Sequence, residues 1–248
     1  MVTTYSEGVL SEGSMDALTA IPDIGTEIEQ GLGGVGDGDF LVSIMADDSL
    51  SIRTGEMQSA VMNGHNLILS IAQEQEAACL LHTRYLNGRV INPYVAASRA
   101  APMTEGNYRL SPHGTPLYDQ SVVLLGTVIA KWREGPPGSR PRTFTVIISD
   151  GADTTSRSSP ESVKRLVSDM LLSGEHIVAA IGINDGSTDF RTVFGEMGIP
   201  QPWILTPDAS GEQVARAFQT IADALALGAG DAQAFRQLTA GPPASRSD

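Results

Sequence analysis

Hydrophobic and polar positions form blocks along the chain that predict strands and helices in turn. The run FLVSIMA at 40–46 is short, continuous and apolar, as is typical of a strand buried on both faces of a sheet. The run TFTVIIS at 143–149 has the same character, and residues 78–86 and 176–182 are expected to form further strands. These segments predict the interior of a sheet.

Two shorter segments complete the predicted sheet. Residues 90–96 contain Pro93, which lacks an N–H group for a ladder hydrogen bond, so we expect this strand at an edge. Residues 203–205 are expected to form the last strand.

Helical periodicity fills the intervals between these strands. Residues 55–75 and 116–132 carry apolar positions at helical spacing, and Pro116 lies near the first turn of the second segment. A helix is expected to open at Ser159-Pro160-Glu161 and to end before Gly174. An alanine-rich helix is expected over 211–227.

Strands that alternate with helices predict an α/β chain with a mostly parallel central sheet and helices on both faces. We therefore expect a Rossmann-like, three-layer domain over residues 37–230. In such sheets ligands bind at the carboxyl ends of the strands. Residues 1–36 are acidic and rich in glycine, and they predict an arm with short helices around 16–18 and 26–31. Residues 231–248 predict a flexible tail.

Charge and composition narrow the classes of partner. The 248 residues carry a formal net charge of -13, which disfavours nucleic acid because phosphate binding requires clustered Lys and Arg. Cys79 is the single cysteine, so no intramolecular disulfide can form. No apolar stretch approaches the roughly 20 residues that span a bilayer, and the N-terminus lacks the pattern of a signal peptide. We expect no membrane partner and a cytoplasmic location.

Three polar clusters fall where this architecture places a ligand site. DDSLS at 47–51 follows the first strand, HGTPL at 113–117 precedes a helix, and SDG at 149–151 follows the central strand. Alternate side chains of an extended segment point the same way, so Asp47, Ser49 and Ser51 are expected to converge. Thr115 and Asp150 add a hydroxyl and a carboxylate. Oxygen donors of this kind suit a hard cation such as Mg²⁺.

The three clusters together resemble the metal-ion-dependent adhesion site of von Willebrand factor type A domains, whose pattern is Asp-x-Ser-x-Ser, then Thr, then Asp. Thr115 lies 68 positions after Asp47, and Asp150 lies 35 positions after Thr115, similar to the usual intervals of that family. The resemblance covers roughly residues 39–227. Leu50 departs from the family, in which many members carry Gly after the first Ser.

The resemblance implies a role for each of these residues. Asp47, Ser49 and Ser51 would be ligands from the first loop, Thr115 from the second, and Asp150 from the third, the last through water. The cation would be Mg²⁺, or Mn²⁺ or Ca²⁺ in its place. An Asp or Glu of a partner protein would complete its coordination. The function implied is cation-dependent protein recruitment, and an AAA-type ATPase is one partner that such domains accompany in bacteria.

Residues near the clusters are candidates for the rim of the binding face. His113, Asp153 and Tyr108 lie in loops beside the predicted ligands and are expected to contact the partner. Asp48, between Asp47 and Ser49, is expected to face solvent.

Other interpretations remain open at the level of sequence. Ser49, Ser51 and Thr115 taken singly are typical helix caps, and Asp150 followed by Gly is typical of a turn. A scaffold that works independently of metal is also compatible with the pattern. Phosphoryl transfer is disfavoured, because the position two residues after Asp47 is Ser49 and neither lysine follows a late strand. No Walker loop, GxSxG or HExxH motif is present, so we do not expect an enzyme.

Overall fold

The computed structural model describes residues 10–33, 38–53, 56–75, 78–112, 114–184 and 186–242, and a six-stranded sheet lies at its centre. The strands are β1 (Phe40–Ala46), β2 (Cys79–Tyr85), β3 (Val90–Ala96), β4 (Arg142–Ser149), β5 (His176–Gly182) and β6 (Ile204–Leu205). Their order across the sheet is β3-β2-β1-β4-β5-β6. All neighbours pair in parallel except β2 and β3, so the expected mostly parallel sheet is confirmed, with β3 at an edge.

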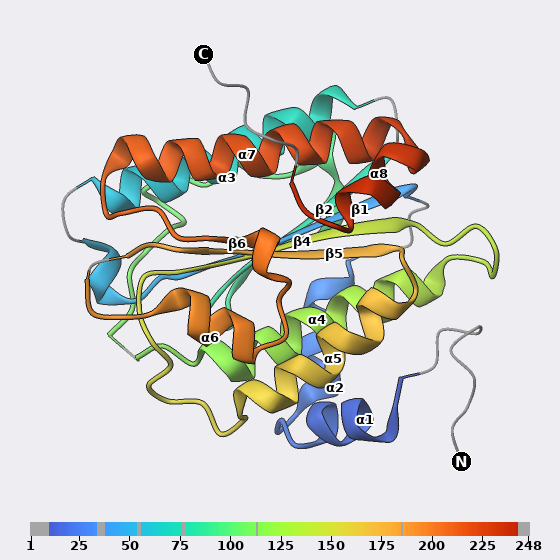
Figure 1. The fold of residues 1–248 in the computed structure, drawn as a ribbon, viewed down its shortest axis with the longest axis horizontal. Helices are drawn as coiled ribbons and strands as arrows, with labels where there is room; N and C mark the ends of the chain where they lie inside the picture. Colours follow the sequence, from blue (N-terminus) through green and yellow to red (C-terminus); the bar gives the residue numbers. More distant parts are fainter. Residues whose placement is uncertain are drawn as a thin grey trace.

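Helices cover both faces of the sheet and make three layers. In Figure 1, α3 and α7 lie above the sheet, and α4, α5 and α2 lie below it. The helices are α1 (Glu12–Thr19), α2 (Ile24–Leu32), α3 (Met57–Glu74), α4 (Leu117–Glu134), α5 (Pro160–Leu172), α6 (Phe190–Glu196), α7 (Gly211–Gly230) and α8 (Ala232–Leu238). Short 3₁₀ turns occupy η2 (Leu50–Arg53), η3 (Ala97–Arg99) and η4 (Gln201–Trp203).

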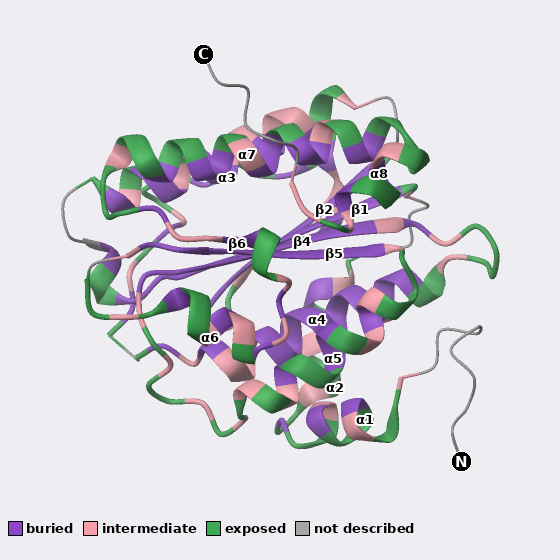
Figure 2. Cartoon of the chain, viewed as in Figure 1, coloured by how far each residue is buried: buried purple, intermediate pink, exposed green. Residues whose placement is uncertain are grey.

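The interior of the sheet is apolar because helices shield both of its faces. Every residue of β1, β2 and β5 is buried, which explains the nearly continuous hydrophobic runs of β1 and β5; β2 also buries the polar residues His82, Thr83 and Arg84. Figure 2 shows buried residues along the strands and along the helix faces that contact them. Among the residues that the structure describes, no helix is long and apolar enough to span a membrane.

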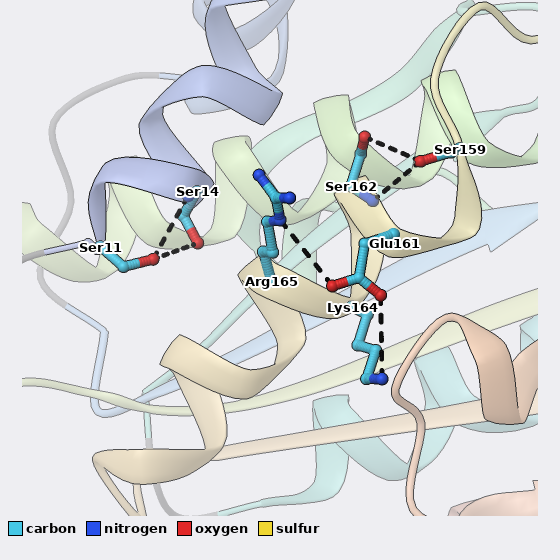
Figure 3. Close-up of polar contacts among 7 residues, drawn as sticks. All are labelled: Ser11, Ser14, Ser159, Glu161, Ser162, Lys164 and Arg165. Carbon is cyan, nitrogen blue, oxygen red and sulfur yellow. Dashed lines mark hydrogen bonds and ion pairs between the residues drawn. The ribbon is translucent and has the colours of Figure 1, made fainter.

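Local capping sets where the helices begin. The side chain of Ser159 accepts the N–H of Ser162 at 3.4 Å, and Pro160 occupies the first turn, so α5 begins where the sequence predicts. Ser11 caps α1 in the same way by accepting the N–H of Ser14 at 3.3 Å. Figure 3 shows both caps, Ser11 with Ser14 on α1 and Ser159 with Ser162 on α5.

In the described part of residues 1–36, α1 and α2 contain the two short helices expected around 16–18 and 26–31. These helices are docked on the domain and do not form a free arm. Both α1 and α2 pack against the outer side of α4, where a side chain at Gly126 would collide with Leu18 and Ile28. The N–H of Ser11 also donates to Asp169 of α5 at 2.7 Å. Acidic and glycine-rich composition obscured the few apolar residues, such as Ile21, that dock these helices on the domain.

The expected flexible tail is also wrong over residues 232–238. These residues form α8, in which Phe235 and Leu238 are buried. The ring of Phe235 lies edge-on to Phe40 of β1, with centroids 5.8 Å apart. The indole N–H of Trp203 donates to the carbonyl of Leu238 at 3.0 Å. The local composition of residues 231–248 does not reveal this docking, because the residues that α8 contacts are far away in the sequence.

A buried arginine fastens α2 to the sheet. Arg84 of β2 is fully buried, and its Nη2 donates to Glu27 of α2 at 3.1 Å and to Gln120 of α4 at 2.8 Å. Its Nε and Nη1 atoms have no hydrogen-bond partner among the described residues. Glu27 is therefore the carboxylate that compensates the buried charge of Arg84.

We expect Glu27→Gln to lower the free energy of unfolding by about 2 kcal/mol, because removal of one partner strands a buried charge. The carboxylate of Glu27 is 33% exposed, which keeps the loss below that of a fully buried pair. Urea unfolding monitored by circular dichroism measures it. The control is Glu161→Gln, whose partners Lys164 and Arg165 are exposed (Figure 3) and whose loss should stay below about 0.5 kcal/mol. Equal losses in the two variants would contradict the prediction.

Candidate metal centre

Two carboxylates meet at the carboxyl edge of the sheet because β1 and β4 are parallel neighbours. Ala46 pairs with Ile148, so Asp47 follows β1 opposite Ser149, and Asp150 comes one residue later on the adjacent strand. The N–H of Asp47 donates to the carbonyl of Ile148 at 3.0 Å and extends the ladder by one step. The strand order reverses between β1 and β4, where α/β sheets place their ligand crevice.

The first loop turns its hydroxyl groups toward Asp150. Ser51 Oγ lies 2.8 Å from Asp150 Oδ1, Ser49 Oγ lies 2.7 Å from Ser51 Oγ, and Ser49 Oγ lies 3.5 Å from Asp150 Oδ1. Asp47 Oδ1 accepts the N–H of Ser49 at 2.8 Å, which folds the loop back over the end of β1. The structure therefore brings the first-loop and third-loop candidates together, as the spacing of the motif predicts.

The donor set fits a small, hard cation. Adjacent oxygens of an octahedron with ligand distances of about 2.1 Å lie about 3.0 Å apart. The oxygens of Ser49, Ser51 and Asp150 are separated by 2.7, 2.8 and 3.5 Å, which brackets that spacing. Among the described residues no three His, Cys, Asp or Glu side chains are placed to hold a metal ion. A cation held at this edge would therefore need hydroxyl oxygens among its ligands.

Thr115 reaches the same edge from the second loop. A Cβ added at Gly151 would lie 3.8 Å from Thr115 Oγ1, which places the hydroxyl beside the start of the third loop. The N–H of Thr115 donates to Thr154 Oγ1 at 2.8 Å, and the N–H of Thr154 donates to the carbonyl of Thr115 at 3.0 Å. This pair of hydrogen bonds fixes the second loop to the third.

Asp153 has a structural task that differs from the expected rim. Its carboxylate accepts the N–H of Tyr118 at 3.3 Å, in the first turn of α4, and the N–H of Ser156 at 3.3 Å. In the opposite direction, Asp119 of α4 accepts hydrogen bonds from the N–H groups of Arg157 and Ser158 in the third loop. Asp153 is half-buried and directed at a helix end, so its main role here is to hold the third loop against α4.

Tyr108 does not lie on an accessible rim. Its side chain is fully buried, its ring stacks on Tyr85 with centroids 5.3 Å apart, and its hydroxyl donates to the carbonyl of Asp47. The expectation of a partner-binding Tyr108 is therefore wrong, because an aromatic ring with one polar tip supports the end of β1 from within. His113, the remaining rim candidate, lies outside the described residues.

Asp48 also differs from its expected exposure. It is 1% exposed, and its Oδ1 accepts the N–H of Asn87 at 3.1 Å from the turn between β2 and β3. Burial raises the pKa of Asp48 to about 6, against the lowering effect of the hydrogen bond from Asn87. The backbone carbonyl of Asp48 accepts the N–H of Ser111 at 2.6 Å. Asp48 thus ties the first loop to its neighbours and does not face solvent.

Ser149 is a member of the site that the motif does not include. Its Oγ donates to Asp47 Oδ2 at 2.7 Å, and the N–H of Asp150 lies 3.4 Å from the same oxygen. With Ser49 on Oδ1, both oxygens of Asp47 are oriented by protein donors. The signal in the sequence was the position of Ser149 directly before Asp150.

Comparison with known proteins defines the class of fold. No family model matches the sequence, and no curated protein matches it either. Solved structures do match. One is a structure of proximal thread matrix protein 1 from the mussel byssus with a zinc-occupied metal-ion-dependent adhesion site (MIDAS) motif. It is 13% identical to this chain with a TM-score of 0.51, over 75% of this chain and 48% of that one.

Two bacterial structures match to the same degree. The pilus adhesin SpaC from Lactobacillus rhamnosus GG is 13% identical with a TM-score of 0.53, over 80% of this chain and 31% of that one. A von Willebrand factor type A protein from Catenulispora acidiphila is 13% identical with a TM-score of 0.50, over 83% of this chain and 43% of that one. This chain spans less than half the length of each. The comparisons show that it has the α/β fold of von Willebrand factor type A domains.

Proposed function

We propose that this chain is a protein-binding module that holds one divalent cation at the carboxyl edge of its sheet and uses it to bind an acidic side chain of a partner. The observation that carries the proposal is the convergence of the oxygens of Ser49, Ser51 and Asp150 at octahedral spacing. The mussel protein with the same fold has zinc in its MIDAS motif, which supports cation binding by such an edge.

The hydroxyl and carboxylate groups of the chain would have different roles at this site. The hydroxyls of Ser49, Ser51 and Thr115 would contact the cation, and Asp47 and Asp150 would supply negative charge directly or through water. The bound cation would supply electrostatic attraction for a carboxylate. Only two of the five donors carry a charge and the three hydroxyls are neutral, so the protein ligands do not exceed the charge of Mg²⁺ and leave the ion electrophilic toward an incoming carboxylate. Mg²⁺ is the cation we propose, with Mn²⁺ as its substitute in experiments.

Binding suits these side chains better than catalysis. A phosphoryl-transfer site built on Asp47 would require a lysine nearby, yet Lys131 is buried at the far end of α4, where it pairs with Glu134 at 2.7 Å. Lys164 lies on the exposed side of α5 and pairs with Glu161. The described residues thus offer no lysine to the edge of the sheet that carries Asp47.

An AAA-type ATPase remains one proposed partner of the recruiting function.

A relaxation measurement on the Mn²⁺-loaded chain tests the proposal. We expect protein-bound Mn²⁺ to relax the side-chain protons of the peptide Ac-Gly-Glu-Gly-NH₂ and to have little effect on Ac-Gly-Gln-Gly-NH₂, because only the carboxylate can bind the ion. EDTA should abolish the difference. Identical relaxation of the two peptides would refute carboxylate capture and would favour a scaffold that works independently of metal.

A further inference from the structure

An exposed leucine lies between two of the site's hydroxyl groups. Leu50 is 45% exposed and lies between Ser49, which is 6% exposed, and Ser51, which is also exposed; Ile52 is fully buried. The described chain has three other large exposed hydrophobic residues, Met15, Leu172 and Leu227, and they lie on α1, at the end of α5 and in α7. Leu50 is therefore the one among them at the edge of the sheet that carries the site.

The backbone on both sides of Leu50 is fixed, so its side chain projects in a preset direction. Ser49 forms a parallel bridge with Ser111, and Ser51 Oγ is held by Asp150 at 2.8 Å. Ile52 anchors the η2 turn in the core. A contact made by Leu50 therefore costs little ordering entropy, because the loop is already in place.

The described surroundings of the ligand oxygens carry little exposed charge. Gly114 and Pro116 flank Thr115, and Gly151 and Ala152 follow Asp150. Two carboxylates beside the ligand residues in the sequence are engaged in contacts of their own. Asp48 is buried against Asn87, and Asp153 is directed at the first turn of α4. In a chain with a net charge of -13, an acidic ligand at this edge would meet Leu50, small residues and the exposed residues Thr154 and Thr155.

We propose that Leu50 is a specificity-determining residue that selects partners whose acidic side chain is flanked by bulky apolar side chains. This inference rests on the proposed cation-dependent function. The acidic group would bind the cation while the neighbouring apolar group covers Leu50 and removes both apolar surfaces from water. Polar segments that carry an acidic residue between small neighbours would bind through the cation alone.

The test compares two peptides on the Mn²⁺-loaded full chain. Dissociation constants for Ac-Leu-Glu-Leu-NH₂ and Ac-Gly-Glu-Gly-NH₂ are measured by proton relaxation, with Ac-Leu-Gln-Leu-NH₂ to remove binding that does not use the carboxylate. We expect the leucine peptide to bind wild type about tenfold more tightly, from burial of about two methylene equivalents. In Leu50→Ser the preference should fall to within about twofold, with the affinity for the glycine peptide unchanged.

Leu172→Ser is the matched control, because it removes a leucine that is 64% exposed at the end of α5, and it should keep the tenfold preference. No preference in wild type, or an undiminished preference in Leu50→Ser, would overturn the role of Leu50 while leaving the cation site standing. A glutamate peptide that binds no better than its glutamine analogue would overturn the proposed function, and the inference would fail with it.

Discussion

Asp47→Asn is expected to lose the rise in melting temperature that Mg²⁺ gives the wild-type chain. A cation that binds only the folded state stabilises it by about 2.7 kcal/mol at a hundredfold excess over Kd. For a chain of this length that energy raises the melting temperature by about 5–10 °C. Asparagine keeps the shape of the Asp47 side chain and removes its charge, so the cation loses much of its electrostatic attraction.

Each protein must be compared with its own melting temperature in EDTA. Asp47 accepts hydrogen bonds from Ser49, Ser149 and Asp150, so a variant at this position is expected to have lower stability even without Mg²⁺. Asp223→Asn, on the exposed face of α7, is the control and should keep the full rise. A normal Mg²⁺ response in Asp47→Asn would remove Asp47 from the site, whatever the stability of the variant.

Mild acid is expected to destabilise the chain by about 3 kcal/mol between pH 8 and pH 5.5. Burial lowers the pKa of His65 to about 4 and the pKa values of His82 and His176 to about 3, against 6.5 in an unfolded chain. Below pH 6.5 these imidazoles are therefore protonated in the unfolded state but stay neutral in the folded state, and the free energy of unfolding falls as the pH falls. At pH 5.5 each of the three imidazoles lowers the free energy of unfolding by about 1.4 kcal/mol.

The Asp48 carboxyl acts in the opposite direction and is included in that sum. Its folded pKa of about 6 exceeds the ordinary value of 3.8, so the folded state takes up its proton first and gains somewhat less than 1 kcal/mol by pH 5.5. Urea unfolding in EDTA across this range measures the net effect without any contribution from bound cation. A free energy of unfolding that is constant from pH 8 to 5.5 would contradict the prediction.

A single substitution isolates one histidine. His65 contacts Thr83 Oγ1 at 2.9 Å and Asn66 Oδ1 at 3.0 Å, and His65→Gln retains a polar group that can meet both partners. On acidification from pH 8 to pH 5.5, the free energy of unfolding of this variant should fall by about 1.4 kcal/mol less than that of wild type, whatever the stability of the variant at pH 8. An unchanged pH dependence would show that His65 is not among the groups that refuse the proton.

The sequence by itself determined the architecture of the sheet. Strands buried on both faces of a sheet have nearly continuous apolar runs, so FLVSIMA and TFTVIIS identified β1 and β4 directly. Helix starts were equally local, because Ser159 and Pro160 specify the first turn of α5 within a few residues. The candidates Asp47, Ser49, Ser51 and Asp150 followed from position, since loops after adjacent parallel strands must meet at one edge.

Only the tertiary structure decided how that edge is supported and bordered. Tyr108 and Asp48 belong to polar loop segments, yet packing across the fold buries both beneath the site, whereas Leu50 is apolar and exposed. The docking of α1, α2 and α8 likewise depends on surfaces of α4 and β1 that lie far away in sequence. Burial is a property of the assembled chain. Local composition therefore fixes which elements form, and long-range packing fixes which of their side chains a partner can reach.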